Sequence, residues 1–271
     1  MLDIKKVYVD TRYKTEDSTS HSDFFIELPR TLNVPDNTIC YITDVVIPVS
    51  WSTVDIRNNK LYIYLDWSDH KIYKEITIPV MNYSGPEFAA AVQLGINTAM
   101  NATIFLKVDY ALGDNMLTFT QLNHLEVIVY IVSSADLQVG NYWSNPIAKE
   151  NITSLNGILR IGKSSYRLSE TTPYKSYIDL FTTRNLYITS SCLASYNIVS
   201  NFGNDVIIKK IAVKAGYSQM LFDSADAGYD FLDVSKRTLS RIDFKLQDSY
   251  GNNIDLRNNH WSFSLVFQEK K

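Results

Sequence analysis

The chain has 271 residues and a formal net charge of −3 at pH 7, a length that suits one elaborated domain or two small ones. This charge argues against a protein whose main role is to bind the phosphate backbone of nucleic acids. Aromatic residues make up 13% of the chain, with 18 tyrosines, whereas Gly and Pro are not enriched. This balance favours β-sheets and excludes collagen-like or low-complexity chains.

The cysteine content and the N-terminus point to a protein that is made and kept inside a cell. Two cysteines, Cys40 and Cys192, are too few for a disulfide framework, and both lie in apolar, strand-like stretches. We expect both to be buried, reduced thiols. The first residues, MLDIKK, are charged, so no signal peptide is expected. No apolar run approaches the roughly 18 residues that predict a membrane-spanning helix, so no membrane span is expected.

The N-terminal quarter of the chain predicts three strands. Apolar and polar residues alternate with a period of two, which is typical of a strand with one buried face. Pro29 is expected to stop the second strand, because proline cannot donate a ladder hydrogen bond. The predicted strands span residues 5–10, 23–28 and 38–49.

The pattern changes to a mixture of strands and one helix from Ser52. Ser84 and Glu87 form a capping box, with Pro86 at the first helical position. Gly95 lies on the apolar face of this helix, which suggests close packing on a sheet. The same region predicts a turn of helix at 134–139. Its strands are predicted at residues 61–67, 75–78, 104–110, 116–121 and 125–132, with a short one at 157–161.

The strand pattern of the N-terminal part returns near Leu186 and runs almost to the end of the chain. The last strand contains Trp261, Phe263 and Phe267, so it must enter a deep core between two sheets. Eight strands in two antiparallel sheets is the strand count of a jelly roll. The five C-terminal strands are predicted at residues 186–190, 206–213, 230–234, 242–246 and 261–267.

The predicted fold class is therefore mainly β: a single eight-stranded jelly-roll β-sandwich with a smaller α+β insertion domain between the third and fourth strands. Residues 1–51 and 184–271 form the predicted jelly-roll domain, and residues 52–183 form the predicted insertion domain.

No catalytic motif is present. The four histidines, His21, His70, His124 and His260, share no metal-ligand spacing. Cys40 lies in the middle of a predicted strand, where a thiol is usually inert. We expect no enzyme activity, no catalytic residue and no cofactor.

One acidic stretch could offer oxygen ligands to calcium, although its spacing differs from that of an EF-hand loop. A solvated loop whose carboxylates cap turns is the simpler interpretation, so no metal site is assigned. The weak candidate ligands are Asp223, Asp226, Asp230 and Asp233.

A series of strand-and-turn phrases resembles the penton, or minor capsid, proteins of Polinton (Maverick) elements and adintoviruses, which are similar to adenovirus penton base and virophage pentons. The resemblance runs from about residue 5 to residue 268, and it includes no catalytic motif. The phrases are VYVDTR at 7–12, SDFFIELP at 22–29, CYITDV at 40–45, IIKKI at 207–211, FLDVSK at 231–236, LQDSYG at 246–251 and WSFSL at 261–265.

The resemblance implies a structural capsid protein whose single jelly-roll protomers form a homopentamer at each icosahedral vertex. It implies contacts with a double jelly-roll major capsid protein, assembly inside the host cell and a final location in the virion capsid. A host surface receptor is left open. Because the sequence contains no Arg-Gly-Asp, the integrin binding of some adenovirus pentons is not implied.

Fold alone does not fix function, so an alternative remains open. A β-sandwich of this size also suits a receptor- or carbohydrate-binding module. Such a module would bind its ligand without forming vertex-type assemblies.

Overall fold

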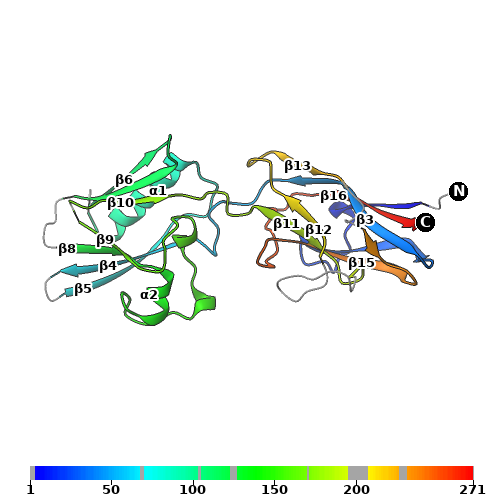
Figure 1. Ribbon diagram of the computed structural model, residues 1–271, viewed down its shortest axis with the longest axis horizontal. Helices are drawn as coiled ribbons and strands as arrows, with labels where there is room; N and C mark the ends of the chain where they lie inside the picture. Colours follow the sequence, from blue (N-terminus) through cyan, green and yellow to red (C-terminus); the bar gives the residue numbers. More distant parts are fainter. Residues whose placement is uncertain are drawn as a thin grey trace. The chain divides into compact units, whose positions relative to one another are not determined.

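The computed structural model describes residues 4–67, 70–102, 105–122, 127–169, 171–194, 207–225 and 231–270. The protein is mainly β, as the sequence predicts, and its strand pairs are antiparallel. The chain divides into two compact units (Figure 1). Unit 1 comprises the chain up to Trp51 and again from Thr183 onward, and unit 2 is Ser52–Thr182.

Unit 1 contains two sheets that face each other across one core. The short 3-10 helix η1 (Thr11–Tyr13) follows its first strand. The first sheet has the order β1 (Lys5–Asp10), β16 (Ser262–Glu269), β3 (Thr38–Pro48), β13 (Met220–Asp223), and β14 (Leu232–Asp233) also pairs with β3. The second sheet has the order β12 (Ile207–Ala212), β11 (Asn185–Thr189), β15 (Thr238–Gln247), β2 (Asp23–Asn33).

Strands β13 and β14 share one edge of β3. Strand β13 pairs with Val45–Pro48 of β3, and β14 pairs with Ile39 and Cys40 of β3. Strand β16 pairs with β3 along its opposite edge. Because β13 and β14 together occupy one place beside β3, each sheet of unit 1 has four strand positions. Sequence reasoning found β14 as a longer strand and missed β13, because neither piece is long enough to show a clear alternation.

The core of unit 1 is built from the inward-facing residues of both sheets. Phe244 on β15 meets Phe263 on β16 edge-to-face at a ring-centroid distance of 4.9 Å. Trp261, just before β16, packs edge-on against Phe24 of β2 at 5.8 Å. The prediction that the last strand enters a deep aromatic core is confirmed.

Strand β2 corrects one sequence expectation. It does not stop at Pro29 but runs on to Asn33. Its pairing with β15 shifts register between Leu239 and Arg241, and Pro29 falls in the irregular part. A proline is tolerated there because no ladder hydrogen bond is required of it.

Unit 2 has a core of its own between two smaller sheets and the helix α1 (Gly85–Ala99). Helix α1 packs on the edge strand of the three-stranded sheet (Figure 1). The first sheet has the order β5 (His70–Thr77), β4 (Lys60–Trp67), β8 (Val127–Ile131), β9 (Tyr166–Leu168). The second has the order β10 (Tyr174–Tyr177), β7 (Met116–Gln121), β6 (Leu106–Ala111).

The predicted capping box of α1 is confirmed. The Glu87 carboxylate accepts hydrogen bonds from the Ser84 backbone N–H at 2.9 Å and from the Ser84 hydroxyl at 2.7 Å. The helix begins one residue earlier than expected, so Gly85 and not Pro86 is its first residue.

The connection between β8 and β9 confirms one prediction and corrects another. The expected helical turn is present as α2 (Ser134–Val139). It is followed by the 3-10 helices η2 (Lys149–Asn151) and η3 (Leu155–Gly157). The strand expected at 157–161 is absent from this described stretch. Ile158 and Leu159 are buried, so their apolar character reflects burial in a turn.

Within the described residues, no helix has the length and apolar character needed to cross a membrane.

Candidate interaction surface

The solvent-facing side of the β1–β16–β3–β13 sheet carries large apolar side chains at both of its edges. On β1, Val9 points into the core, so Tyr8 points outward. Tyr8 lies opposite Ser264 of β16 and is 77% exposed. A long aromatic side chain is thus left in solvent beside a short hydroxyl.

The opposite edge of the same sheet is also apolar on its outer side. Leu221 of β13 points inward, so Met220 and Phe222 point outward, and Phe222 is 71% exposed. Phe231, just before β14, packs against Tyr41 of β3 at a ring-centroid distance of 4.8 Å. We call the following set the apolar face: Tyr8, Tyr41, Val46, Met220, Phe222 and Phe231.

A β-bulge keeps this face continuous across β3. Asp44 has a positive φ of 53° and is the extra residue where the β3–β16 register shifts. The Lys6 ammonium donates to the Asp44 carboxylate at 2.8 Å, and hydrogen bonds from Lys6 and then Ser264 lower the pKa of this carboxyl. The charges within the face are therefore already paired with each other.

The outer side of the other sheet of unit 1 is chemically different. The Arg241 guanidinium lies over the Phe25 ring at 4.0 Å and also pairs with Asp17. Lys245 pairs with Asp23 at 3.3 Å. The first sheet of unit 1 thus exposes large apolar side chains on its outer side, whereas the outer side of the second sheet carries two charged pairs.

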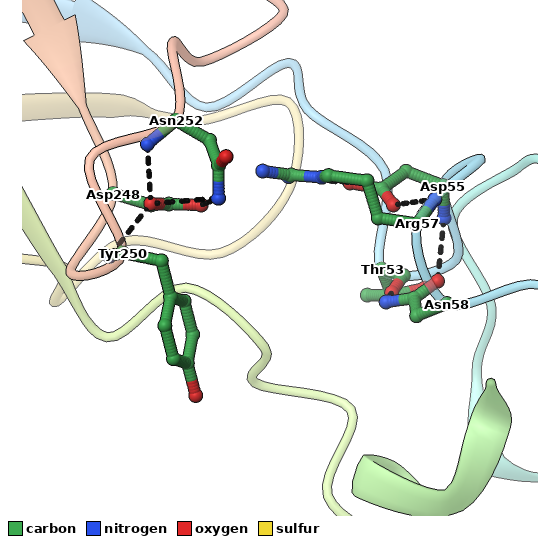
Figure 2. Close-up of polar contacts among 7 residues, drawn as sticks. All are labelled: Thr53, Asp55, Arg57, Asn58, Asp248, Tyr250 and Asn252. Atoms are coloured by element: carbon green, nitrogen blue, oxygen red, sulfur yellow. Dashed lines mark hydrogen bonds and ion pairs between the residues drawn. The ribbon is translucent and has the colours of Figure 1, made fainter. Parts of the chain in front are cut away.

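The loop between β15 and β16 is held rigidly by one carboxylate (Figure 2). Asp248 accepts hydrogen bonds from the backbone N–H groups of Tyr250 at 2.8 Å and Asn252 at 3.0 Å. Gly251 takes a φ of +81°, which glycine adopts without strain. This turn leaves the Tyr250 side chain 77% exposed.

Unit 2 opens with a turn of similar chemistry, also drawn in Figure 2. The Asp55 carboxylate accepts from the Arg57 backbone N–H at 2.7 Å, and the Asn58 side chain accepts from the Asp55 N–H at 2.8 Å. In unit 1, Asp255 accepts from the Arg257 N–H at 2.8 Å. The sequence echo between DIRNN at 55–59 and DLRNN at 255–259 reflects this local turn, in which an Asp side chain bonds the backbone two residues on.

Half of the tyrosines of unit 2 belong to an aromatic cluster that packs on itself. Tyr64 of β4 contacts Tyr73, Tyr130 and Tyr142, and the last two rings stack at 4.7 Å. Tyr62 packs edge-on against Trp143 at 5.0 Å. These rings thus pack mainly against one another within unit 2, whereas the apolar face of unit 1 is exposed.

The two weak metal candidates that the structure describes, Asp223 and Asp233, do not meet in a site. Asp223 lies with its carboxylate 2.9 Å from the ammonium of Lys209, whose side chain is almost fully buried. Asp233 accepts from the Ser235 backbone N–H at 2.9 Å. Asp226 and Asp230 lie outside the described residues. In the part of the chain that the structure describes, no group of three or more His, Cys, Asp or Glu side chains could hold a metal ion.

The histidines are used in different ways. His21 and His260 stack with ring centroids 4.4 Å apart, and His21 Nδ1 lies 3.1 Å from the Asn259 carbonyl. This pair joins the loop before β2 to the start of β16. His70 begins β5 beside Trp67. His124 lies outside the described residues.

The two cysteines are free thiols. Cys40 is buried as expected, and burial raises its pKa to about 12, which keeps it protonated and unreactive. Cys192 is only half-buried and lies in the turn after β11, so the expectation of a buried strand position was wrong for this residue.

A cleft of about 260 Å³ lies beside His21, between residues 20–22 and the loop at 253–258. Typical small-molecule sites have about 300–1,000 Å³ and are lined mainly by apolar groups. This cleft is smaller than that range. It is therefore a poor basis for a ligand-binding assignment, and the apolar face is the stronger candidate surface.

No protein-family model and no curated protein matches the sequence. Among solved structures, the crystal structure of the selenomethionine-labelled mavirus penton protein matches with a TM-score of 0.56 and 8% sequence identity. The match covers 99% of this chain and 100% of that one. The chain shares the fold of the mavirus penton protein. Because the likeness extends over the full length of both chains, it includes unit 2 as well as unit 1.

Proposed function

We propose that the protein is a structural subunit of a viral capsid, a penton that assembles as a homopentamer at the vertices of an icosahedral shell. The observation that carries this proposal is the whole-chain fold likeness to the mavirus penton protein. The resemblance of the strand-and-turn phrases to penton proteins of Polinton elements and adintoviruses supports the same assignment.

The strand order of unit 1 supports a jelly-roll interpretation. Its two sheets have four positions each, and the orders β1–β16–β3–β13 and β2–β15–β11–β12 are those of two interlocked Greek keys. On this proposal residues 1–51 and 184–271 form the jelly roll. Residues 52–183 are an insertion between its third and fourth strands, β3 and β11.

The proposed mechanism is assembly. In a cyclic ring each subunit presents two different surfaces to its two neighbours, and the rotation between subunits closes the ring. Double jelly-roll major capsid proteins would surround the ring in a shell that assembles inside the host cell.

The test is the mass of the purified protein in solution, measured by light scattering behind a sizing column. A particle of about five times the 31.0 kDa chain mass is expected, followed by five-membered rings in electron micrographs. A trimer would favour a receptor- or carbohydrate-binding module. A stable monomer, even with a major capsid protein added, would contradict the proposal.

A further inference from the structure

The apolar face needs a partner to explain its exposure. Phe222 and Tyr8 are each more than two-thirds exposed, and they lie at opposite edges of one sheet. Single exposed apolar side chains are common, but several on one contiguous sheet surface mark an interaction site. Phe, Tyr and Met are also the residue types that are enriched in protein interfaces.

The dimensions of the sheet match those of a subunit interface. Its central strands have 8 and 11 residues, and it has four strand positions. At about 3.3 Å per residue and about 4.8 Å per strand, the face measures roughly 20 by 30 Å, or about 600 Å². A standard interface buries about 800 Å² on each partner. The face with its rim is therefore large enough for a folded protein partner.

The charged pair on this side of the sheet would oppose burial less than two unpaired charges would. Lys6 and Asp44 pair with each other at 2.8 Å, whereas Asp223 of β13 faces the interior like Leu221 and pairs there with Lys209 at 2.9 Å. Burying an unpaired charge is strongly unfavourable, whereas a pair that is buried together loses hydration but keeps its mutual attraction. The strands between the two apolar edges carry the short, partly exposed side chains of Ser262 and Thr43, which allow close approach.

We propose that the apolar face is the surface of each subunit that a second copy of this chain covers. This inference rests on the proposed function, because a closed ring requires one surface of each subunit to be covered by a different surface of the next. The two outer sides of unit 1 differ in this way: one carries the exposed apolar side chains beside the Lys6–Asp44 pair, and the other carries the Arg241–Asp17 and Lys245–Asp23 pairs. The self-complementary contact of a two-fold dimer would not require such a difference.

The experiment compares the assembly of the full chain with that of two variants, Phe222→Glu and Tyr8→Glu, one at each edge of the face. Both side chains are exposed, so each subunit is expected to keep its circular dichroism spectrum. A charge placed inside the contact is expected to weaken assembly about 30-fold or more, the effect of losing an interface residue that contributes strongly to binding. Leu112→Glu is the matched control, because Leu112 is 82% exposed and lies in unit 2.

The outcomes separate this inference from the proposed function. Rings from the wild type and from Leu112→Glu, with monomers from Phe222→Glu and Tyr8→Glu, support the inference. Rings from all four proteins overturn the inference and leave the proposed function standing. Monomers from all four, also when a major capsid protein is added, remove the proposed function and the inference together.

Discussion

Asp243 shows how one side chain can fix a loop from the middle of a strand. It lies on β15 with only 8% of its surface exposed. Its carboxylate accepts from the backbone N–H groups of Ser191 at 2.8 Å and Cys192 at 2.9 Å. The hydroxyls of Ser190 and Ser191 also donate to it. Burial opposes ionisation, but these hydrogen bonds outweigh it and lower the pKa of the Asp243 carboxyl.

We predict that Asp243→Asn lowers the free energy of unfolding by about 2 kcal/mol at pH 7, because it removes hydrogen bonds to a charged acceptor. Urea denaturation measures this change. Asp36→Asn is the control, since Asp36 is exposed and lies 3.6 Å from Lys236, and it should change stability by about 0.5 kcal/mol or less. Equal effects of the two variants would contradict the role assigned to Asp243.

The same carboxylate predicts a pH dependence. A folded-state pKa below the unfolded value of about 3.9 means that the ionised carboxylate stabilises the fold above that pH. This stabilisation is lost as the pH falls through the lowered folded-state pKa. The stability difference between the wild type and Asp243→Asn should therefore be largest at neutral pH and shrink below about pH 4. A difference that stays constant with pH would show that the charge is not its source.

The sequence does not reveal this clamp. Asp243 alternates with Ile242 and Phe244, a pattern that reads as a solvent-facing position on a strand. The groups that bury it lie about fifty residues earlier in the chain, so no local pattern links them. The weak candidates for metal ligands were selected because they lie close together in the sequence. The two that the structure describes, Asp223 and Asp233, each contact another partner, Lys209 and Ser235.

At the scale of elements, helix α1 was predicted correctly because its signals are local. A capping box, an apolar face and a glycine within that face all lie in one short stretch. An added Cβ at Gly95 would lie 2.8 Å from Ile76 Cγ2, so the predicted close packing on a sheet is confirmed. Ile76 is a β-branched residue of β5 and cannot easily move aside.

We predict that Gly95→Val lowers the free energy of unfolding by about 1–3 kcal/mol, the usual effect of overpacking. Leu94→Val is the control, because Leu94 is on the same helix but is 68% exposed, and only a few tenths of a kcal/mol are expected from helix propensity. Chemical denaturation of both variants tests this. Equal stabilities would show that the helix can shift away from β5.

Strands were predictable in proportion to their length. The long strands β3, β15 and β16 show several cycles of alternation and were found, although their ends were misplaced by a few residues. Strands β9, β10 and β13 have three or four residues and were missed. Such short segments are strands because a neighbour pairs with them. Part of the apolar face was missed for the same reason, since Met220 and Phe222 lie on β13.

At the scale of the whole molecule, the two units have separate hydrophobic cores. The larger core contains the inward residues of both sheets of unit 1. The second contains α1 together with the inward residues of unit 2, including Phe88, Phe119 and Tyr174. The change from a strand-only to a mixed pattern at Ser52 is visible in the sequence. Which surfaces remain free for assembly is not visible there, because buried and exposed aromatic residues follow the same alternation.

Unit 2 is continuous in sequence, so its independence can be tested by expressing Ser52–Thr182 alone. At roughly 130 residues it is expected to bury about two-thirds of its unfolded surface, enough for a stable domain. We predict a dispersed amide NMR spectrum and one cooperative unfolding transition. A fragment ending at Pro173 is the control: it lacks β10, whose Tyr174 and Ser176 are buried and which forms one edge of the β10–β7–β6 sheet. This shorter fragment should not fold. If Ser52–Thr182 also gave a collapsed spectrum, the core of unit 2 would depend on the rest of the chain, and an insertion domain would be the wrong description.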